Sequence, residues 1–169
     1  MKALSRKVAW ALVALITVYP GMAMNHSIAQ EDKEITCLAQ NAYHEARGQH
    51  EVGMLGVTFV VINRMKSKRF PNSACEVVWQ KRLNRAGNWI PQFSWTLDGK
   101  SDEITHFSSW SKALELASDA YHERVVSPVG QADHYHRKDI TKWWSKKMAI
   151  VAEIGDHLFF DSRRQRTSS

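Results

Sequence analysis

The amino-acid sequence predicts a single domain that is mainly α with a small β element, an α+β fold class. The first observation is an apolar stripe at helical spacing over residues 35–46, which Gly48 should end. The second is the segment 51–65, which is apolar nearly all round. Its length favours a buried helix, although its β-branched residues would also suit a strand. The third is a pair of segments, 131–136 and 149–160, whose composition is typical of extended chain.

Two shorter helices are predicted from the residues that would begin them. Ser73 and Glu76 form an S-x-x-E capping box and should start a short helix. Ser109 is placed to cap a further helix with an apolar face. Trp79 and Trp110 lie on the apolar faces of these two segments, so we expect both rings in the core.

The N-terminal residues 1–29 have the pattern of an export signal. Three basic residues precede a 12-residue apolar run that ends at Tyr19, and small residues follow. Cleavage is expected after Ala23 or Ala29, which places the protein in the periplasm, outside the cell or in the wall. The run is shorter than the roughly 20 residues of a spanning helix. The alternative is an uncleaved anchor that tethers the protein to the inner membrane.

Charge is concentrated at the two ends of the chain. The formal net charge is +6, yet residues 30–160 hold 17 basic against 16 acidic side chains. A basic face that would bind nucleic acid is therefore not expected. We expect one monomeric domain over residues 31–161. A flexible basic tail, 162–169, should be weakly attracted to anionic wall polymers or a membrane surface.

The chain contains two cysteines, Cys37 and Cys75. Export would place them in an oxidising compartment, where two cysteines usually pair. A bridge between them would close a loop of about 38 residues and stabilise the fold by roughly 3–4 kcal/mol. The alternative is two free, buried thiols. Two cysteines without a C-x-x-C spacing cannot form a structural zinc site alone.

Glu45 is the first candidate for chemistry. It lies in the last turn of the predicted helix 35–46, at the edge of the apolar stripe. Burial at such a position raises the pKa of a carboxyl group, and a half-buried carboxyl beside aromatic rings can act as a general acid near neutral pH. The alternative is an ordinary solvated charge on a helix surface.

A series of short motifs follows in a fixed order along the chain. They are Cys37-Leu-Ala, Tyr43-His-Glu-Ala-Arg-Gly48, Gly56-Val with Val61-Ile-Asn63-Arg64, Phe70-Pro71, Cys75-Glu-Val-Val78, Gln92-Phe-Ser-Trp95, Trp110, Ala132-Asp-His-Tyr-His136, Trp143 or Trp144, and Gly155-Asp-His157. In this order and spacing the chain resembles the SleB-type cell wall hydrolases, which include spore-cortex-lytic enzymes. The resemblance covers roughly residues 35–160.

The resemblance implies a lysozyme-like fold, similar to that of lytic transglycosylases. It also implies an enzyme that cleaves the glycan strands of peptidoglycan between N-acetylmuramic acid and N-acetylglucosamine. It implies Glu45 as the catalytic residue, and it carries no required cofactor or metal. The family often has a second acid directly after the E-A-R-G motif. Here Gln49 occupies that position, and Glu51 follows two residues later.

One carboxyl group is enough for a lytic transglycosylase. A hydrolase needs a second one, at roughly 5–5.5 Å for retention or 6.5–9.5 Å for inversion. Glu51, Asp98 and Asp133 stay open as second acids.

Substrate contacts are expected from aromatic and amide side chains, because a flat ring with a polar end suits the face of a sugar. For Asn63 the alternative is a helix cap. The predicted substrate-binding residues are Tyr43, Asn63, Phe93, Ser94, Trp95, His134 and Tyr135.

The sequence leaves two other functions open. A zinc-dependent wall amidase or peptidase could use His134, His136 and His157 as ligands. The pair His44-Glu45 does not complete an H-E-x-x-H motif, because Gly48 stands where the second histidine would be. The third possibility is a wall-binding module without catalysis.

Overall fold

The computed structural model describes residues 20–165. The apolar run of the predicted export signal lies outside these residues. Both predicted cleavage positions, Ala23 and Ala29, fall inside the first helix, α1 (Pro20–Ala46). Within residues 20–165 no helix combines the length and the apolar character that crossing a membrane requires.

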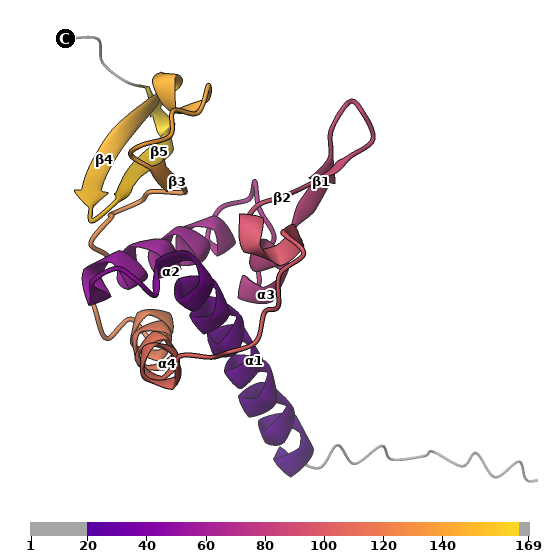
Figure 1. The fold of residues 1–169 in the computed structure, drawn as a ribbon. Coiled ribbons are helices and arrows are strands. Elements are labelled where there is room, and N and C mark those ends of the chain that lie inside the picture. Colours follow the sequence, from indigo (N-terminus) through magenta and orange to yellow (C-terminus); the bar gives the residue numbers. More distant parts are fainter. Residues whose placement is uncertain (1–19, 166–169) are drawn as a thin grey trace, which may run out of the picture.

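The described chain contains four α-helices, two 3-10 turns and five strands (Figure 1). After α1 come α2 (Glu51–Met65), α3 (Ala74–Val78), β1 (Lys81–Leu83), β2 (Trp89–Pro91), η1 (Ser94–Leu97), α4 (Phe107–Tyr121), β3 (His134–Arg137), η2 (Ser145–Lys147), β4 (Met148–Ile154) and β5 (His157–Gln165). The prediction of a mainly helical α+β domain is confirmed.

The helices form the body of the molecule around α1 and α2. The predicted stripe on α1 is buried, including Leu38, Ala42 and Tyr43, and the helix ends two residues before Gly48. The apolar segment 51–65 is a helix, α2, and most of its residues are buried. Because α2 contacts helices on one side and the sheet on the other, it is apolar nearly all round.

The structure corrects two predictions, one about the residue that caps α4 and one about the burial of Trp79. Ser109 does not cap α4: the helix begins at Phe107 with His106 as its N-cap. The chain before α4 is held by Tyr43, whose hydroxyl oxygen accepts hydrogen bonds from the backbone N–H groups of Thr105 and His106. A tertiary contact therefore fixes the start of this helix. Trp79 is 43% exposed and is not a core residue.

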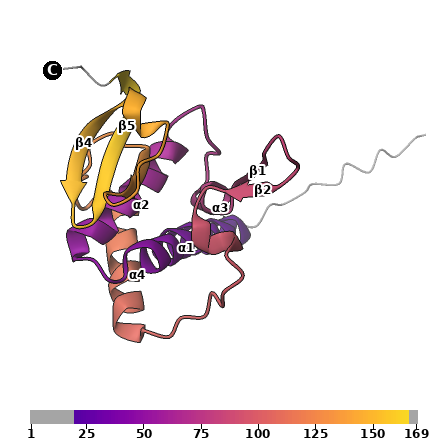
Figure 2. The ribbon, with the colours of Figure 1, turned by 45° about the horizontal axis from the view of Figure 1, so that its top comes forward.

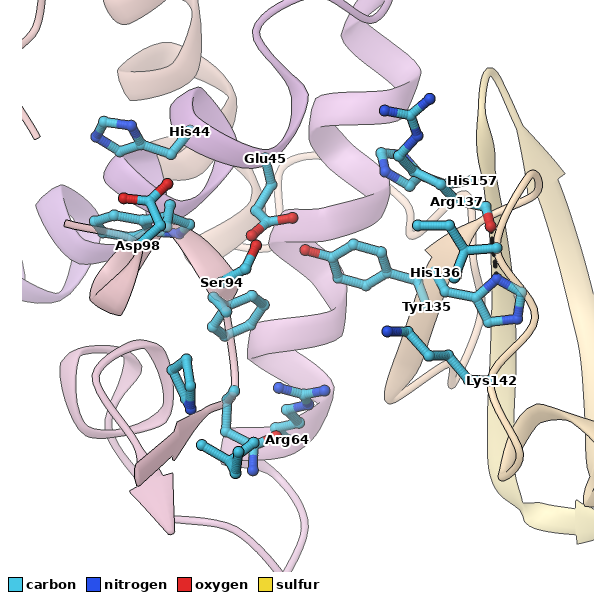
Figure 3. Close-up of a pocket in the computed structure, with 16 residues that line it drawn as sticks. His44, Glu45, Arg64, Ser94, Asp98, Tyr135, His136, Arg137, Lys142 and His157 are labelled. Atoms are coloured by element: carbon cyan, nitrogen blue, oxygen red, sulfur yellow. Dashed lines mark hydrogen bonds between the residues drawn. The ribbon is translucent and has the colours of Figure 1, made fainter. Parts of the chain in front are cut away.

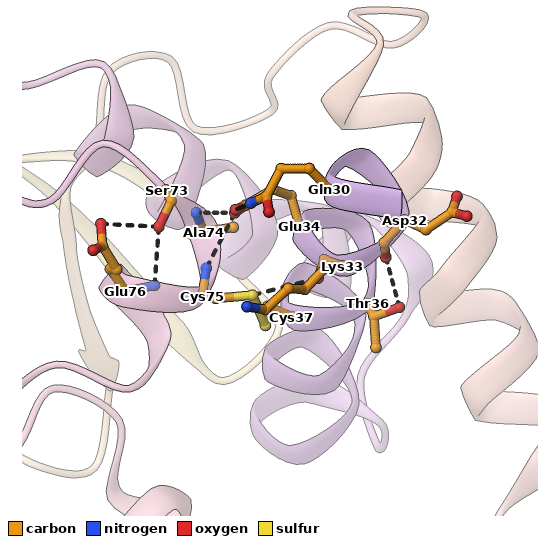
Figure 4. Close-up of a disulfide and its surroundings, with 10 residues drawn as sticks. All are labelled: Gln30, Asp32, Lys33, Glu34, Thr36, Cys37, Ser73, Ala74, Cys75 and Glu76. Atoms are coloured by element: carbon orange, nitrogen blue, oxygen red, sulfur yellow. Dashed lines mark hydrogen bonds between the residues drawn. A yellow bond between two sulfur atoms is a disulfide. The ribbon is translucent and has the colours of Figure 1, made fainter. Parts of the chain in front are cut away.

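The disulfide between Cys37 and Cys75 is present and joins α1 to α3 (Figure 4). The predicted capping box is also present, because Ser73 Oγ accepts a hydrogen bond from the Glu76 N–H. The buried carboxylate of Glu34 accepts from the N–H groups of Ala74 and Cys75. These contacts fix a five-residue helix that could not persist alone.

The second half of the chain adds a three-stranded antiparallel sheet in the order β3-β5-β4. Figure 2 shows the sheet lying against α2. At Gly56 of α2 an added Cβ would lie 2.7 Å from Phe159 Cζ. The turn between β4 and β5 contains Gly155, whose φ of +57° favours glycine. Strands β3, β4 and β5 confirm the predicted extended segments, with the first strand beginning at His134.

The predicted boundary at residue 161 is wrong, because β5 continues through Gln165. Ser162 donates hydrogen bonds from its N–H and its hydroxyl to the carboxylate of Asp133, and Arg163 pairs with Asp161. Residues 162–165 of the predicted tail therefore belong to the sheet. Residues 166–169 lie outside the described chain.

The sequence did not predict the hairpin of β1 and β2. Its strands pair in antiparallel register with Lys81 opposite Pro91 and Leu83 opposite Trp89. Figures 1 and 2 both show it projecting away from the helical body.

Candidate active site

A cavity of about 540 Å³ is lined by residues of α1, α2, the β2–η1 segment and the three-stranded sheet (Figure 3). Glu45 enters it from the C-terminal end of α1 and Arg64 from α2, while Tyr135 enters from β3. The chain between β2 and the end of η1 forms a third wall. The lining comprises His44, Glu45, Arg64, Ile90, Pro91, Gln92, Phe93, Ser94, Trp95, Asp98, Tyr135, His136, Arg137, Ile140, Lys142 and His157.

Glu45 is half-buried in this cavity, and burial raises the pKa of its carboxyl group. Two neighbours act in the opposite direction: the Tyr135 hydroxyl and the positive charge of Arg64 both lower that pKa. Burial is the larger effect. Glu45 therefore holds its proton to a higher pH than an exposed glutamate does.

The Tyr135 hydroxyl points toward the Glu45 carboxyl group (Figure 3). It is enclosed and completes no hydrogen bond with any of residues 20–165. The two groups face each other without completing a hydrogen bond of ordinary geometry, which is common in active sites without substrate. Burial and the nearby Glu45 charge hold the pKa of Tyr135 well above its ordinary value. The phenol thus stays protonated and can act only as a donor to the carboxylate.

Arg64 is the buried cation of the site, with 4% of its surface exposed. Its Nε donates to the backbone carbonyl of Asp133 at 2.8 Å. Its guanidinium carbon lies 5.1 Å from the ring centres of both Phe70 and Phe93. Its Nη1 atom is buried without a partner among the described residues. Arg64 therefore supplies fixed positive charge beside Glu45.

Trp95 forms a rigid part of the wall. Its ring stacks on His44 with 4.4 Å between centroids, and its Nε1 donates to Asn41 Oδ1 at 3.1 Å. Burial lowers the pKa of His44, which keeps this imidazole neutral at physiological pH. The ring pair limits how far the cavity wall can move.

Four of the seven predicted substrate-binding residues line the cavity: Phe93, Ser94, Trp95 and Tyr135. The other three do not. Tyr43 is fully buried and holds the start of α4, as described above. Asn63 donates to the carbonyls of Gly130 and Ala132. His134 shares a hydrogen bond with Asp133.

Of the three possible second acids, the structure brings one to the cavity. Asp98 lines it and is exposed. Glu51 is exposed and pairs with Lys112. Asp133 is buried; burial alone would raise its pKa, but hydrogen bonds from His134 and Ser162 outweigh this and lower it far below its ordinary value. Asp133 therefore anchors the end of the sheet.

Gln49, which replaces the family's second acid, has a structural role. Its Nε2 donates to Asp156 Oδ2 at 3.0 Å, and its Oε1 accepts from the Asp156 N–H at 3.2 Å. A Cβ at Gly155 would lie 2.1 Å from the same Oε1. An amide can make both contacts with Asp156, whereas a carboxylate would repel it.

The proposed three-histidine zinc site is not formed. His136 and His157 line the cavity, but His134 lies outside the lining. Among residues 20–165 no group of three or more His, Cys, Asp or Glu side chains is arranged to hold a metal ion.

Arg64, Arg137 and Lys142 were not predicted as site residues. A cation near the end of an otherwise apolar helix was the available signal for Arg64, because buried arginines need fixed partners. Arg137 and Lys142 lie on exposed segments, and only the folded chain places them at the cavity.

A helical α+β domain with a half-buried carboxyl group facing an open cavity is a lysozyme-like arrangement. The chain belongs to the cell wall hydrolase family, whose sequence model matches residues 48–160. The match begins three residues after Glu45, so it does not itself cover that side chain.

The spore cortex-lytic enzyme of Bacillus subtilis is 39% identical over 129 residues, which is 76% of this chain and 37% of the relative. That of Halalkalibacterium halodurans is 28% identical over 138 residues, 81% of this chain and 37% of the relative. This chain thus spans less than half the length of these curated relatives.

Two solved structures share the fold. The catalytic domain of the Bacillus cereus SleB protein is 26% identical, with a TM-score of 0.56 over 76% of this chain and 89% of that one. The catalytic domain of the germination-specific lytic transglycosylase SleB from Bacillus anthracis is also 26% identical. Its TM-score is 0.58 over 76% of this chain and 93% of that one.

Proposed function

We propose that this chain cleaves the glycan strands of peptidoglycan as a lytic transglycosylase, with Glu45 as the single acid and base. The observation that carries the proposal is the buried Glu45 carboxyl group, whose raised pKa and position in a large open cavity suit a proton donor. The names of the related lytic enzymes support the same substrate.

The reaction needs two proton transfers at one carboxyl group. Glu45 first gives its proton to the oxygen of the glycosidic bond as that bond to C1 of N-acetylmuramic acid breaks. The carboxylate then takes the proton of the C6 hydroxyl of the same sugar while the C6 oxygen bonds to C1. The product has a 1,6-anhydro end, and no water is consumed. Each transfer is typically worth 10²–10⁴-fold in rate.

The phenol of Tyr135 and the charge of Arg64 stabilise the ionised form of Glu45 between the two transfers. Burial stabilises the protonated form that begins the reaction. Opposed influences of this kind leave one carboxyl group able to give and then to accept a proton.

The test is digestion of purified sacculi by the wild type and by Glu45→Gln, with the released fragments weighed by mass spectrometry. We expect anhydro ends from the wild type and at least a 10²-fold loss with Glu45→Gln. Glu51→Gln, an exposed acid paired with Lys112, is the matched control and should keep its activity. Reducing ends would identify a hydrolase, and full activity of Glu45→Gln would refute the catalytic assignment.

We also propose that the chain acts outside the cytoplasm, and the disulfide supports this because such bonds persist in oxidising compartments. The N-terminal sequence of the protein recovered from its host tests the idea. Processing after Ala23 or Ala29 is the expected result, and an intact N-terminus in the cytosolic fraction would contradict it.

A further inference from the structure

The β1–β2 hairpin lies outside the packed core, and both of its faces are open. Lys81, Arg82, Leu83, Trp89 and Ile90 are all exposed. An isolated two-stranded hairpin is marginally stable in water. Exposed apolar side chains on such an element call for a binding role rather than a packing role.

The tip of the hairpin is polar and is hydrogen-bonded within itself. Asn84 Oδ1 accepts hydrogen bonds from the N–H groups of Ala86 and Asn88, and the Gly87 N–H donates to the Asn84 carbonyl. Gly87 has a φ of +79°, which fixes the turn. The hairpin is thus held in shape by its own turn.

The hairpin is also strongly basic. No acidic residue occurs between Glu76 and Asp98, while Lys81, Arg82 and Arg85 lie in this stretch. None of the three forms a salt bridge with a described residue. Lys81 Nζ instead lies 5.1 Å from the ring centre of Trp89. Unpaired cations beside exposed apolar groups fit a ligand that is both anionic and partly apolar.

The hairpin continues the wall of the catalytic cavity. Ile90 and Pro91 of β2 line that cavity. Arg82 lies directly opposite Ile90 in the strand register, so both side chains project from one face of the hairpin. A polymer leaving the cavity on this side would run along Arg82 toward Arg85 at the turn.

We propose that the hairpin is a second binding surface for glycan strands that still carry peptide stems. Sugar rings would contact the exposed apolar side chains, while Arg82 and Arg85 bind the carboxylates of the stems. This rests on the proposed function and deepens it by naming a peptide-bearing, anionic strand as the preferred substrate.

A lipid bilayer is the less suitable occupant. A hairpin that inserts into a membrane carries its apolar residues at the tip, whereas here the tip is Asn84 to Asn88. The apolar residues Leu83, Trp89 and Ile90 lie nearer the cavity. This distribution favours a ligand that extends from the cavity.

The test compares two double variants, each made in the full chain carrying Glu45→Gln so that binding is measured without cleavage. Arg82→Glu/Arg85→Glu reverses the charge at two positions of the hairpin. Lys146→Glu/Lys147→Glu makes the same charge change at exposed sites outside the cavity lining. We expect the hairpin variant to bind intact sacculi about tenfold more weakly, with the loss greater at low salt. The control should bind as its parent does.

The same proteins are then tested on chitin oligosaccharides, which are stem-free glycan strands without carboxylates. There the two variants should bind equally. Arg82→Gln/Arg85→Gln, which only removes the charges, should show an intermediate loss on intact sacculi, and circular dichroism checks that each variant folds. When Arg82→Glu/Arg85→Glu is made in the chain that keeps Glu45, the KM for sacculi should rise while kcat stays unchanged.

Equal binding of both double variants to intact sacculi would overturn the inference, as would the same defect on stem-free strands. Vesicles of anionic phospholipid supply the remaining arm: loss of vesicle binding with unchanged sacculus binding would assign the hairpin to a membrane instead. Failure of the proposed function is seen separately, because it appears as absence of cleavage by the wild-type chain whatever the binding results are.

Discussion

Glu45 illustrates how a single side chain meets opposed requirements at the scale of the residue. Its burial favours the neutral form, while the Tyr135 hydroxyl and Arg64 favour the anion. Desolvating an ionised carboxyl group costs free energy, so the burial that raises the pKa of Glu45 also weakens the fold at neutral pH.

Replacing Glu45 by Gln should therefore stabilise the protein in a pH-dependent way. The native state holds the Glu45 proton above the ordinary pKa of 4.5, so native stability falls as the pH rises through the raised pKa. Glutamine has no charge to bury. We expect Glu45→Gln to be more stable by on the order of 1 kcal/mol at pH 8, with the difference vanishing below pH 4.5.

Thermal denaturation between pH 4 and pH 8 measures this difference, with Glu51→Gln as the exposed control. A constant difference in Tm across the range would show that the Glu45 charge is not what destabilises the wild type.

Tyr135→Phe removes the phenol that lowers the pKa of Glu45. The proposed reaction needs protonated Glu45, so kcat/KM should fall as the pH rises through that pKa. In the variant this fall should occur at higher pH, and the maximal rate should drop about tenfold because the carboxylate loses an orienting donor. The pH profile of sacculus cleavage checks both effects. A reduced rate with an unmoved profile would mean that Tyr135 acts only in packing.

Gln49→Glu tests why an amide replaces an acid. The new carboxylate would face Asp156 and lose the donor that now bonds it, so stability should fall by about 1–2 kcal/mol at neutral pH. The loss should shrink in acid as the pair is protonated. Gln49→Ala, which removes the contacts without adding charge, should lose less in urea unfolding at pH 7. If Gln49→Glu and Gln49→Ala lose the same free energy of unfolding at pH 7, repulsion by Asp156 is unimportant.

At the scale of the element, α2 and β5 pack closely at Gly56, where an added Cβ would lie 2.7 Å from Phe159 Cζ. Phe159 is completely buried against this position, so neither element can withdraw easily. The contact fixes the sheet, and with it Tyr135, relative to the helical wall.

Gly56→Ala should therefore destabilise the protein by about 1–3 kcal/mol through overpacking, although alanine favours helices. Urea unfolding measures the effect. Gly48→Ala, where an added Cβ meets no atom within 4 Å, is the matched control. A stabilised Gly56→Ala variant would show that α2 and β5 can separate without penalty.

The elements that the sequence predicts well are those whose signal is local. The stripe on α1 and the capping box of α3 are written in residues that are neighbours along the chain. The start of α4 was misplaced because Tyr43, more than 60 positions away, determines it. The β1–β2 hairpin was missed because its strands are three residues long and lack a buried face to produce alternation.

At the scale of the whole molecule, the site combines elements that sequence cannot place together. Glu45 was predicted from its helix edge, whereas Arg64 of α2 and Tyr135 of β3 join it at the cavity only through the packing of these elements. Asn63 and His134 belong to the same motifs as Arg64 and Tyr135, but their side chains form hydrogen bonds with Ala132 and Asp133 instead of lining the cavity. A motif identifies the neighbourhood of a site, and packing decides which side chains enter it.

The disulfide gives a prediction for the molecule as a whole. Neither Cys37 nor Cys75 lines the cavity, so reduction should leave the cleavage rate at low temperature nearly unchanged. It should lower the free energy of unfolding by about 3 kcal/mol, because the bridge closes a loop of 38 residues. Urea unfolding with and without a reductant measures this, and a Cys37→Ser/Cys75→Ser variant is the control that reductant should not affect.

The hydrogen bonds between Gln49 and Asp156 have a mechanical consequence. Gln49 follows Glu45 by four positions and forms two hydrogen bonds with Asp156 in the β4–β5 turn. These bonds connect the chain just after Glu45 to the three-stranded sheet. A hinge motion that closed the sheet and the helices over a bound polymer would have to break these hydrogen bonds. The enzyme should instead work as a fixed frame, with the strand threading through a gap of constant width.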